Sequence, residues 1–131
     1  MSEPIVTLIV VPRERFSAAR QSLESVLANT RVPHRLIYVQ AGGPPRLTSW
    51  LEGQAQQHGF TLQVVDRFLR PNQARNAALA GVDTPFVAFL DNDAVVEAGW
   101  LEALLACANE TGADIVGPAT LIGSASKAVV H

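Results

Sequence analysis

The sequence predicts an α/β protein in which a mainly parallel sheet is covered by helices on both faces, a three-layer α/β/α sandwich. Two observations support this fold class. Short runs rich in β-branched and aromatic residues alternate along the chain with longer segments whose apolar residues recur at helical spacing. Strands that alternate with helices favour parallel pairing, because each helix carries the chain back across a face of the sheet.

The expected strands are short apolar runs that end at proline, glycine or a polar residue, as strands buried in a sheet usually do. Five runs fit this pattern, and a sixth begins near the end of the chain. They cover residues 5–11, 35–39, 60–65, 86–90, 113–116 and 128–130.

The expected helices lie between these strands and carry start and stop signals. They cover residues 17–29, 47–58, 71–80 and 97–111. Ser17, which follows the apolar Phe16, is expected to cap the first helix. Gly59 and Gly112 are expected to end the second and the fourth, because glycine readily adopts the left-handed conformation that closes a helix.

The length and composition predict a single domain over residues 1–131. The chain is long enough for one sizeable core, and its 48% of hydrophobic residues with 17% of charged residues argues against disorder. Ten basic and twelve acidic side chains leave a net charge of −2. This charge offers no electrostatic attraction to nucleic acid or to an anionic membrane, so no nucleic-acid partner is expected.

The single cysteine and the start of the chain indicate the compartment. Because Cys107 is the only cysteine, the chain has no internal disulfide framework, and this fits a reducing environment. The first residues lack the pattern of a signal peptide, and no apolar stretch is long enough to span a membrane. We expect a cytoplasmic protein, either free or peripheral to the inner face of a membrane. A homo-oligomer is an open alternative to a monomer.

Asp91-Asn92-Asp93 is the pattern that points most directly to chemistry. It follows the apolar run 85–90, and carboxylates are costly to bury unpaired, so the chain is expected to leave the sheet here. Ligands of open α/β sheets bind beyond the carboxyl ends of the strands, and two carboxylates there can hold a hard divalent cation that bridges to phosphate. The motif indicates a metal site for a nucleotide-linked substrate; a solvated acidic turn is the alternative.

Three further places carry candidate binding residues. Arg75 lies near the start of a helix, where it either faces a diphosphate or pairs with an acidic loop. Pro12, Arg13 and Glu14 end the first strand, where a loop either cradles a base or ribose or is simply solvated. Gln40 ends the second strand, and either hydrogen-bonds a nucleobase or is an ordinary edge residue.

Several known kinds of site are disfavoured. Gly42-Gly43 lacks the helix-opening pattern of a dinucleotide fingerprint, and the phosphate-loop pattern Gly-x-x-x-x-Gly-Lys-Ser/Thr is absent. His34, His58 and His131 are too scattered for a metal-ligand pattern. Neither a Ser-His-Asp nor a Cys-His arrangement is indicated.

Five segments, in this order, resemble the nucleotide-binding half of family 2 glycosyltransferases. They are Val6-Thr7-Leu8-Ile9-Val10-Val11-Pro12, Ser22-Leu23-Glu24-Ser25-Val26-Leu27, Ala74-Arg75-Asn76, Phe89-Leu90-Asp91-Asn92-Asp93 and Gly99-Trp100-Leu101-Glu102. The resemblance spans nearly the whole chain, and the strand, Asp-x-Asp and Gly-Trp-Leu segment is its most specific part. It implies the Rossmann-like GT-A fold and a nucleotide-diphosphate sugar as donor.

The resemblance also implies roles for the candidate residues. Asp91 would approach the ribose or a metal-bound water, and Asp93 would ligate a Mn²⁺ or Mg²⁺ ion that bridges the diphosphate. Arg75 would lie near the phosphates or brace the acidic pair. The loop from Pro12 to Glu14 would line the base pocket. The acceptor, whether saccharide, lipid or protein, is not indicated.

Two departures from the family pattern limit the expectation. The family usually has an aspartate at the end of the second strand, in contact with the base, whereas this chain has Gln40. The half that binds the acceptor and holds the catalytic base is expected beyond residue 131, so we expect a truncated domain and assign no catalytic base.

Two alternatives to a glycosyltransferase donor domain remain. One is a module that binds a nucleotide sugar or a partner protein without turnover. The other is a nucleotidyltransferase, which is disfavoured because the stretch after the first strand, Pro12-Arg13-Glu14-Arg15, lacks the glycines of a phosphate loop.

Overall fold

The computed structural model describes residues 3–13, 15–118, 121–122 and 129–130. The chain divides into two compact units, Met1–Ala98 and Gly99–His131, and each is described by itself. The expectation of one domain over residues 1–131 stays a prediction.

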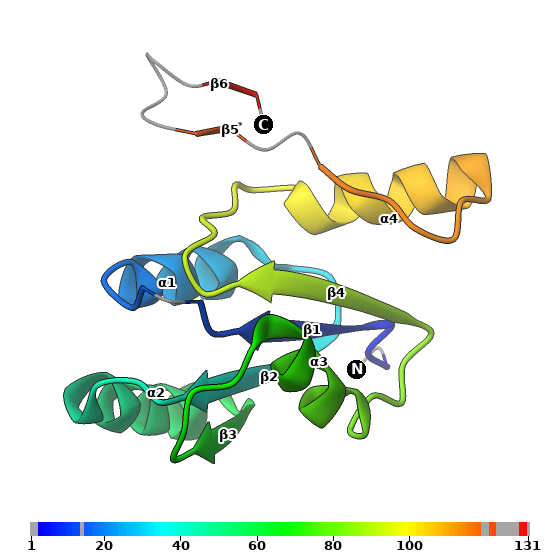
Figure 1. Ribbon diagram of the computed structural model, residues 1–131. Helices are drawn as coiled ribbons and strands as arrows, with labels where there is room; N and C mark the ends of the chain where they lie inside the picture. Colours follow the sequence, from blue (N-terminus) through cyan, green and yellow to red (C-terminus); the bar gives the residue numbers. More distant parts are fainter. Residues whose placement is uncertain (1–2, 14, 119–120, 123–128, 131) are drawn as a thin grey trace. The chain divides into compact units, whose positions relative to one another are not determined.

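The first unit contains a four-stranded sheet in which all neighbouring strands are parallel (Figure 1). The strands are β1 (Val6–Val11), β2 (His34–Ala41), β3 (Thr61–Val65) and β4 (Phe86–Asp91), in the spatial order β3-β2-β1-β4. The four strands expected over residues 5–90 are confirmed, and β2 is longer than expected at both ends. Because the strands are parallel, they all end at one edge of the sheet, which we call the carboxyl edge.

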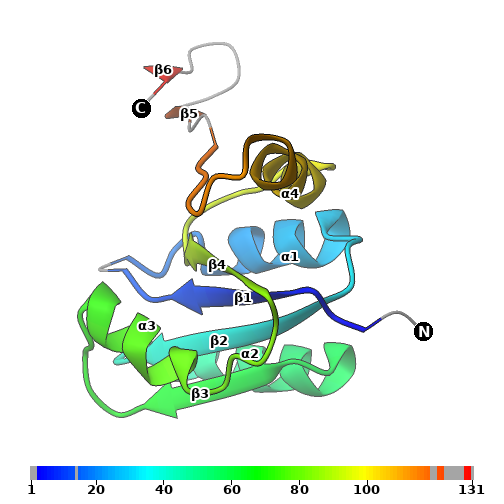
Figure 2. The ribbon, with the colours of Figure 1, turned by 90° about the vertical axis from the view of Figure 1, so that its right-hand side faces the viewer.

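Helices cover both faces of this sheet, as expected. α1 (Ala19–Asn29) and α2 (Pro45–His58) lie on one face, and α3 (Pro71–Leu79) lies on the other (Figure 2). The residues buried between α3 and the sheet form one apolar cluster, the α3 cluster: Ile9, Val11, Ile37, Val39, Ala41, Leu69, Ala74 and Ala78. Covering both faces explains why every residue of β1 is buried and why its sequence is a continuous apolar run.

The strand alternation decides which side chains share a face. Ala41 belongs to the α3 cluster, so its neighbour Gln40 points to the opposite face, toward α2. Val11 also belongs to the α3 cluster and pairs in register with Asp91, so the Asp91 side chain lies on the α3 face. These two predicted site residues therefore lie on opposite faces of the sheet.

One predicted helix end in this unit is confirmed and one predicted helix cap is wrong. Gly59 ends α2 in the left-handed conformation, with φ of 74°, which confirms the predicted stop. Ser17 is not the cap of α1: the N-cap residue is Ala18, and no side-chain cap bond forms. The Ala19 N–H instead donates to the Phe16 carbonyl at 3.2 Å, so a backbone turn opens this helix.

The second unit contains α4 (Trp100–Thr111) and a two-stranded antiparallel ladder of β5 (Leu121–Ile122) and β6 (Val129–Val130). Gly99 precedes α4 with φ of 84°, so the helix begins three residues later than expected, and Gly112 ends it as expected. The strand expected over 113–116 is wrong: these residues form no ladder with any described residue, and Ile115 is 91% exposed. A strand needs a hydrogen-bonded neighbour, which an apolar run alone does not supply. The expected strand over 128–130 is confirmed at β6, while residue 128 lies outside the described residues.

Candidate functional site

The chain leaves the sheet at the acidic motif. The Asn92 N–H still donates to the Val11 carbonyl at 3.0 Å, and the Ala94 N–H then turns back to the Asp91 carbonyl at 3.1 Å. Asp91 therefore ends β4 and Asp93 lies in the turn beyond it. The Asp91 side chain is 40% exposed and Asp93 is exposed, so both carboxylates can reach a ligand at the carboxyl edge.

Arg75 lies beside this motif on the α3 face. Its Nη2 is 3.9 Å from Asp91 Oδ1, its Nη1 donates to Asn72 Oδ1 at 2.8 Å, and its guanidinium lies 5.6 Å from the centre of the Phe89 ring. The ion pair is long and partly exposed, so its own contribution to stability is at most about 1 kcal/mol. A guanidinium has five N–H donors, so Arg75 can approach Asp91 and still present donors to an anion.

The donor set at the motif fits a metal that is shared with a substrate. Within the described ranges no group of three or more His, Cys, Asp or Glu side chains gathers to hold an ion. Mg²⁺ seldom has an all-protein cage and is usually held by one or two carboxylates together with substrate phosphates. Asp91 and Asp93 can supply these carboxylate oxygens, and a diphosphate would complete the coordination.

The buried side-chain amide of Asn92 also indicates an incomplete site. It is fully buried, and neither its Oδ1 nor its Nδ2 has a hydrogen-bond partner in the part of the chain that the structure describes. A buried amide without partners costs about 1–3 kcal/mol. The structure thus places an amide without partners among the described residues between the two carboxylates.

Gln40 lies apart from Arg75 and Asp91, on the α2 face. It is 1% exposed, and its amide oxygen and nitrogen have no hydrogen-bond partner among the described residues. A Cβ on Gly43 would lie 2.0 Å from Gln40 Nε2, so the glycine leaves room for this amide. Gln40 also lines a surface hollow of about 480 Å³ that includes Thr48 and Asp66.

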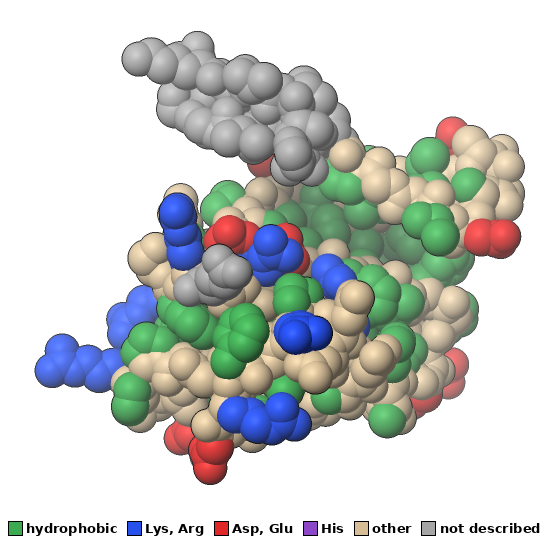
Figure 3. All heavy atoms as spheres, viewed as in Figure 1, with side chains coloured by type: hydrophobic (Ala, Val, Ile, Leu, Met, Phe, Trp, Pro, Cys, Tyr) green, Lys and Arg blue, Asp and Glu red, His purple; other side chains and the backbone are tan. Residues whose placement is uncertain are grey.

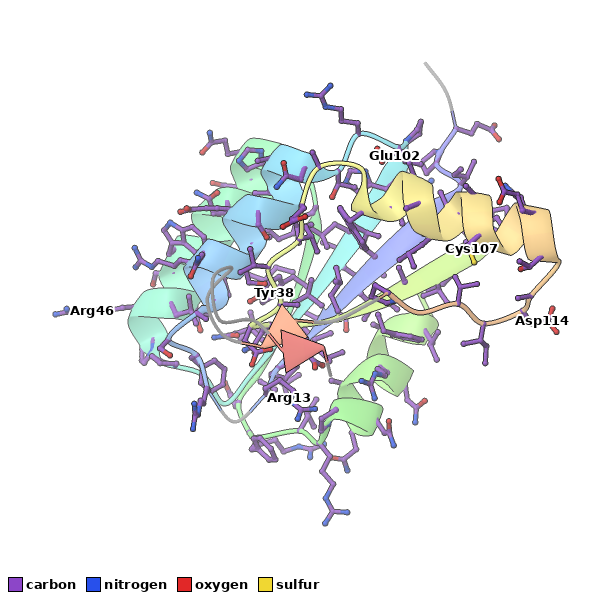
Figure 4. The ribbon with its side chains drawn as sticks, turned by 90° about the horizontal axis from the view of Figure 1, so that it is seen from above. Arg13, Tyr38, Arg46, Glu102, Cys107 and Asp114 are labelled. Carbon is purple, nitrogen blue, oxygen red and sulfur yellow. The ribbon has the colours of Figure 1, made fainter. Side chains whose placement is uncertain are left out.

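The end of β1 reaches the same edge as the acidic motif. Pro12 is buried and Arg13 is exposed on the loop that follows (Figure 4). Glu14 lies outside the described residues, so its predicted role is a proposal only. The structure thus brings Pro12, Arg13, Arg75, Asp91 and Asp93 to one edge of one sheet.

Residues 7–128 match the family described as Glycosyl transferase family 2. This chain belongs to glycosyl transferase family 2. The family suspected from the sequence is therefore confirmed.

Similar proteins agree with this family. A pre-mycofactocin glycosyltransferase of Mycobacterium tuberculosis (strain CDC 1551 / Oshkosh) is 57% identical over 35 residues, which are 27% of this chain and 7% of that protein. S. aureus TarS 1–349 in complex with UDP-GlcNAc has a TM-score of 0.67 and 20% identity, covering 83% of this chain and 32% of that one. The mannosyltransferase PcManGT from Pyrobaculum calidifontis, in complex with GDP-Man and Mn²⁺, has a TM-score of 0.65 and 24% identity, covering 86% of this chain and 33% of that one.

These likenesses confirm the GT-A fold that the resemblance implied. The family 2 chain spans about a third or less of the solved structures and 7% of the curated relative.

In this family 2 chain, polar side chains of α1 hold the segment that follows the acidic motif. Ser22 Oγ donates to the Ala94 carbonyl, Ser25 Oγ accepts from the Val96 N–H at 3.1 Å, and Asn29 Nδ2 donates to the Val96 carbonyl at 2.9 Å. We call Ser22, Ser25 and Asn29 the α1 clamp.

The α1 clamp was not among the residues predicted from the sequence. The spacing of its residues, three and then four, places them on one face of a helix, and this polar stripe beside the buried Leu23 and Val26 was the signal available.

None of the helices within the described ranges is long and apolar enough to cross a membrane.

Proposed function

We propose that this chain binds a nucleotide-diphosphate sugar at the carboxyl edge and belongs to a protein that transfers the sugar to an acceptor. The observation that carries the proposal is the acidic turn at the end of β4, with Arg75 beside it, in a chain of glycosyl transferase family 2. Two structurally similar proteins were solved with such donors, one with UDP-GlcNAc and one with GDP-Man and Mn²⁺, which supports the same class of ligand here.

The residues of the edge then take distinct roles. Asp93 ligates a Mn²⁺ or Mg²⁺ ion, and Asp91 contacts that ion, its bound water or the ribose. Arg75 presents its free N–H groups to the diphosphate. When bound, the metal supplies Lewis acidity that neutralises the charge on the departing nucleoside diphosphate.

The nucleoside is assigned to the ends of β1 and β2. The loop of Pro12, Arg13 and Glu14 lines the base pocket in this proposal. Gln40 is the second proposed base contact. Because Gln40 lies on the α2 face, this contact forms only if the base extends to the α2 side of the sheet edge. The proposed acceptor is a saccharide, a lipid or a protein. The proposed location is the cytoplasm or the inner face of a membrane.

Calorimetry tests the donor site directly. We would titrate the protein with UDP, GDP and TDP, with and without Mn²⁺, and repeat the titrations with Asp93→Asn. We expect binding that depends on Mn²⁺ and weakens at least about tenfold in the variant, because one of two protein ligands loses its charge. Asp114→Asn, an exposed acidic residue after α4, is the matched control and should bind as the wild type does.

Two results would count against the proposal: no nucleotide binds, or the binding is the same without metal. Hydrolysis of a bound nucleotide sugar distinguishes an enzyme from a module that only binds. An isolated chain that binds donor but never turns it over would favour the module.

A further inference from the structure

The connection between β3 and α3 holds an apolar side chain in solvent. Phe68 is 53% exposed although the next residue, Leu69, is buried in the α3 cluster. The connection is braced at its base, because the Gly42 N–H donates to the Val65 carbonyl at 3.1 Å and a Cβ on Gly42 would lie 3.0 Å from Phe68 N. The connection therefore holds the Phe68 side chain in solvent, and this side chain does not pack against the sheet.

Exposed arginines lie on the same connection and on the neighbouring helix. Arg67 and Arg70 lie on the same connection and Arg46 lies in the first turn of α2, and all three are exposed. In the part of the chain that the structure describes, no carboxylate lies within 4.0 Å of their guanidinium groups. Figure 4 shows Arg46 pointing outward from α2, and Figure 3 shows basic side chains projecting along the face formed by α2, β3 and α3.

We group the exposed residues around the carboxyl end of β3 as the β3-end patch. Its members are Arg46, Val64, Arg67, Phe68 and Arg70. Val64 is 48% exposed and adds a second apolar side chain, and Asp66 is the acidic residue of the β3–α3 connection. Three arginines against one carboxylate make the patch basic, although the whole chain has a net charge of −2.

The β3-end patch borders the proposed base contact, because Val64 pairs in register with Gln40, and it lies apart from the acidic motif. β3 and β4 are the two edge strands of the sheet, with β2 and β1 between them. Three strand spacings, about 14 Å, therefore separate the end of β3 from the acidic motif at the end of β4. Nothing in the donor proposal requires Phe68 or Arg67.

We propose that the β3-end patch docks the protein on an anionic lipid bilayer. Phe68 and Val64 enter the interfacial region, and the arginines contact the headgroup phosphates. An aromatic side chain flanked by arginines is the composition that interfacial membrane segments use, and basic residues near the surface are attracted to anionic lipids. A bilayer is favoured over a protein partner because lipids can deform around a projecting side chain, whereas a protein would need a matching pocket.

Vesicle flotation tests the docking. Wild-type protein would be mixed with vesicles of phosphatidylcholine alone, or of phosphatidylcholine with phosphatidylglycerol. We expect flotation with the anionic vesicles only, and a smaller floating fraction as the salt concentration rises. Failure to float with anionic vesicles overturns the proposal.

Matched variants locate the surface. Phe68→Ser should weaken binding to anionic vesicles about tenfold, and Arg67→Ala about fivefold. The controls are Leu79→Ser, a 40% exposed apolar residue of α3, and Arg31→Ala, an exposed arginine between α1 and β2. Both controls should float as the wild type does, and thermal unfolding confirms that each variant is folded. Equal losses in variants and controls overturn the assignment to this patch.

A competition separates the bilayer from other anionic ligands. Saturating UDP with Mn²⁺ should leave flotation unchanged, and so should polyuridylate. Release of the protein by either ligand overturns the proposal and assigns the patch to nucleotide or to RNA. Asp93→Asn should also float normally, so failure of the donor proposal and failure of the docking proposal remain distinguishable.

Discussion

At the scale of single residues, the carboxyl edge combines charges that are exposed with amides that are buried. Asp91, Asp93 and Arg75 reach solvent and can exchange water for a ligand. Asn92 and Gln40 are buried with unpaired polar atoms among the described residues, which is costly in the protein alone. A buried polar group without a partner calls for an explanation, and a water or ion at the site is one of them.

Arg75 gives a prediction about charge and geometry together. Arg75→Lys keeps the charge but loses the planar fork, and should weaken the binding of UDP with Mn²⁺ about threefold to tenfold. Because the pair with Asp91 is long and partly exposed, the free energy of unfolding should change by less than about 1 kcal/mol. Calorimetry and urea unfolding measure the two quantities.

The control for Arg75 is Arg35→Lys, since Arg35 forms an exposed pair with Asp83 at 3.2 Å, away from the carboxyl edge. An equal loss of nucleotide affinity in both variants would refute a specific role of Arg75.

Tyr38 gives a prediction about pH. It is the chain's only tyrosine, it is 1% exposed, and burial raises the pKa of its hydroxyl above the ordinary value. The folded state therefore favours the neutral phenol, so this contribution to stability is complete below about pH 10 and is lost as the pH rises toward the folded pKa.

Tyr38→Phe should remove this alkaline loss. The hydroxyl has no partner among the described residues, so the substitution should change the free energy of unfolding by about 1 kcal/mol or less at pH 7. Urea unfolding at about pH 7 and about pH 11, followed by circular dichroism, measures both effects, and the phenolate absorbance of the folded wild type reports the pKa of Tyr38. A tyrosine that ionises at its ordinary pKa in the folded protein would contradict the prediction.

At the scale of elements, α1 supports the acidic motif by hydrogen bonds to the segment that follows it, although none of the proposed metal-binding residues lies on α1. The α1 clamp fixes residues 94–96, and these residues follow directly on Asp93. The turn between the two carboxylates is thus held from one side by β1, through the Asn92 N–H, and from the other by α1.

Loosening the α1 clamp should weaken metal-dependent binding. We expect Asn29→Ala to reduce the affinity for UDP with Mn²⁺ about threefold, and to cost about 1 kcal/mol of stability through the lost hydrogen bond. Affinity for UDP without metal should change less, because the clamp acts on Asp93. Ser17→Ala, at a position where the structure shows no cap, is the control and should alter neither quantity.

At the scale of the whole molecule, the net charge does not describe how charged and apolar side chains are distributed over the surface. The net charge of −2 predicted no attraction to an anionic surface, yet three exposed arginines gather in the β3-end patch. β4 is an edge strand of the described sheet and carries Phe86, Val87 and Phe89 at 37–43% exposure. Self-association stays a prediction.

Much of the fold was predictable because its signals are local. β1 is a continuous apolar run, since helices cover both faces of the sheet there, and glycine ends α2 and α4 where a left-handed residue is needed. The acidic motif could be placed at a strand end because two carboxylates cannot continue a buried strand. These features depend on residues that are neighbours in the sequence.

The tertiary structure decided everything that depends on residues far apart. It paired Arg75 with Asp91, joined the α1 clamp to residues 94–96, and left 113–116 without a strand partner in the described part of the chain. It also turned Gln40 to the α2 face, because a side chain's face depends on the register with its neighbouring strands. The sequence by itself thus determined most of the elements and the edge at which the proposed site lies, and only the packed sheet decided which side chains meet there.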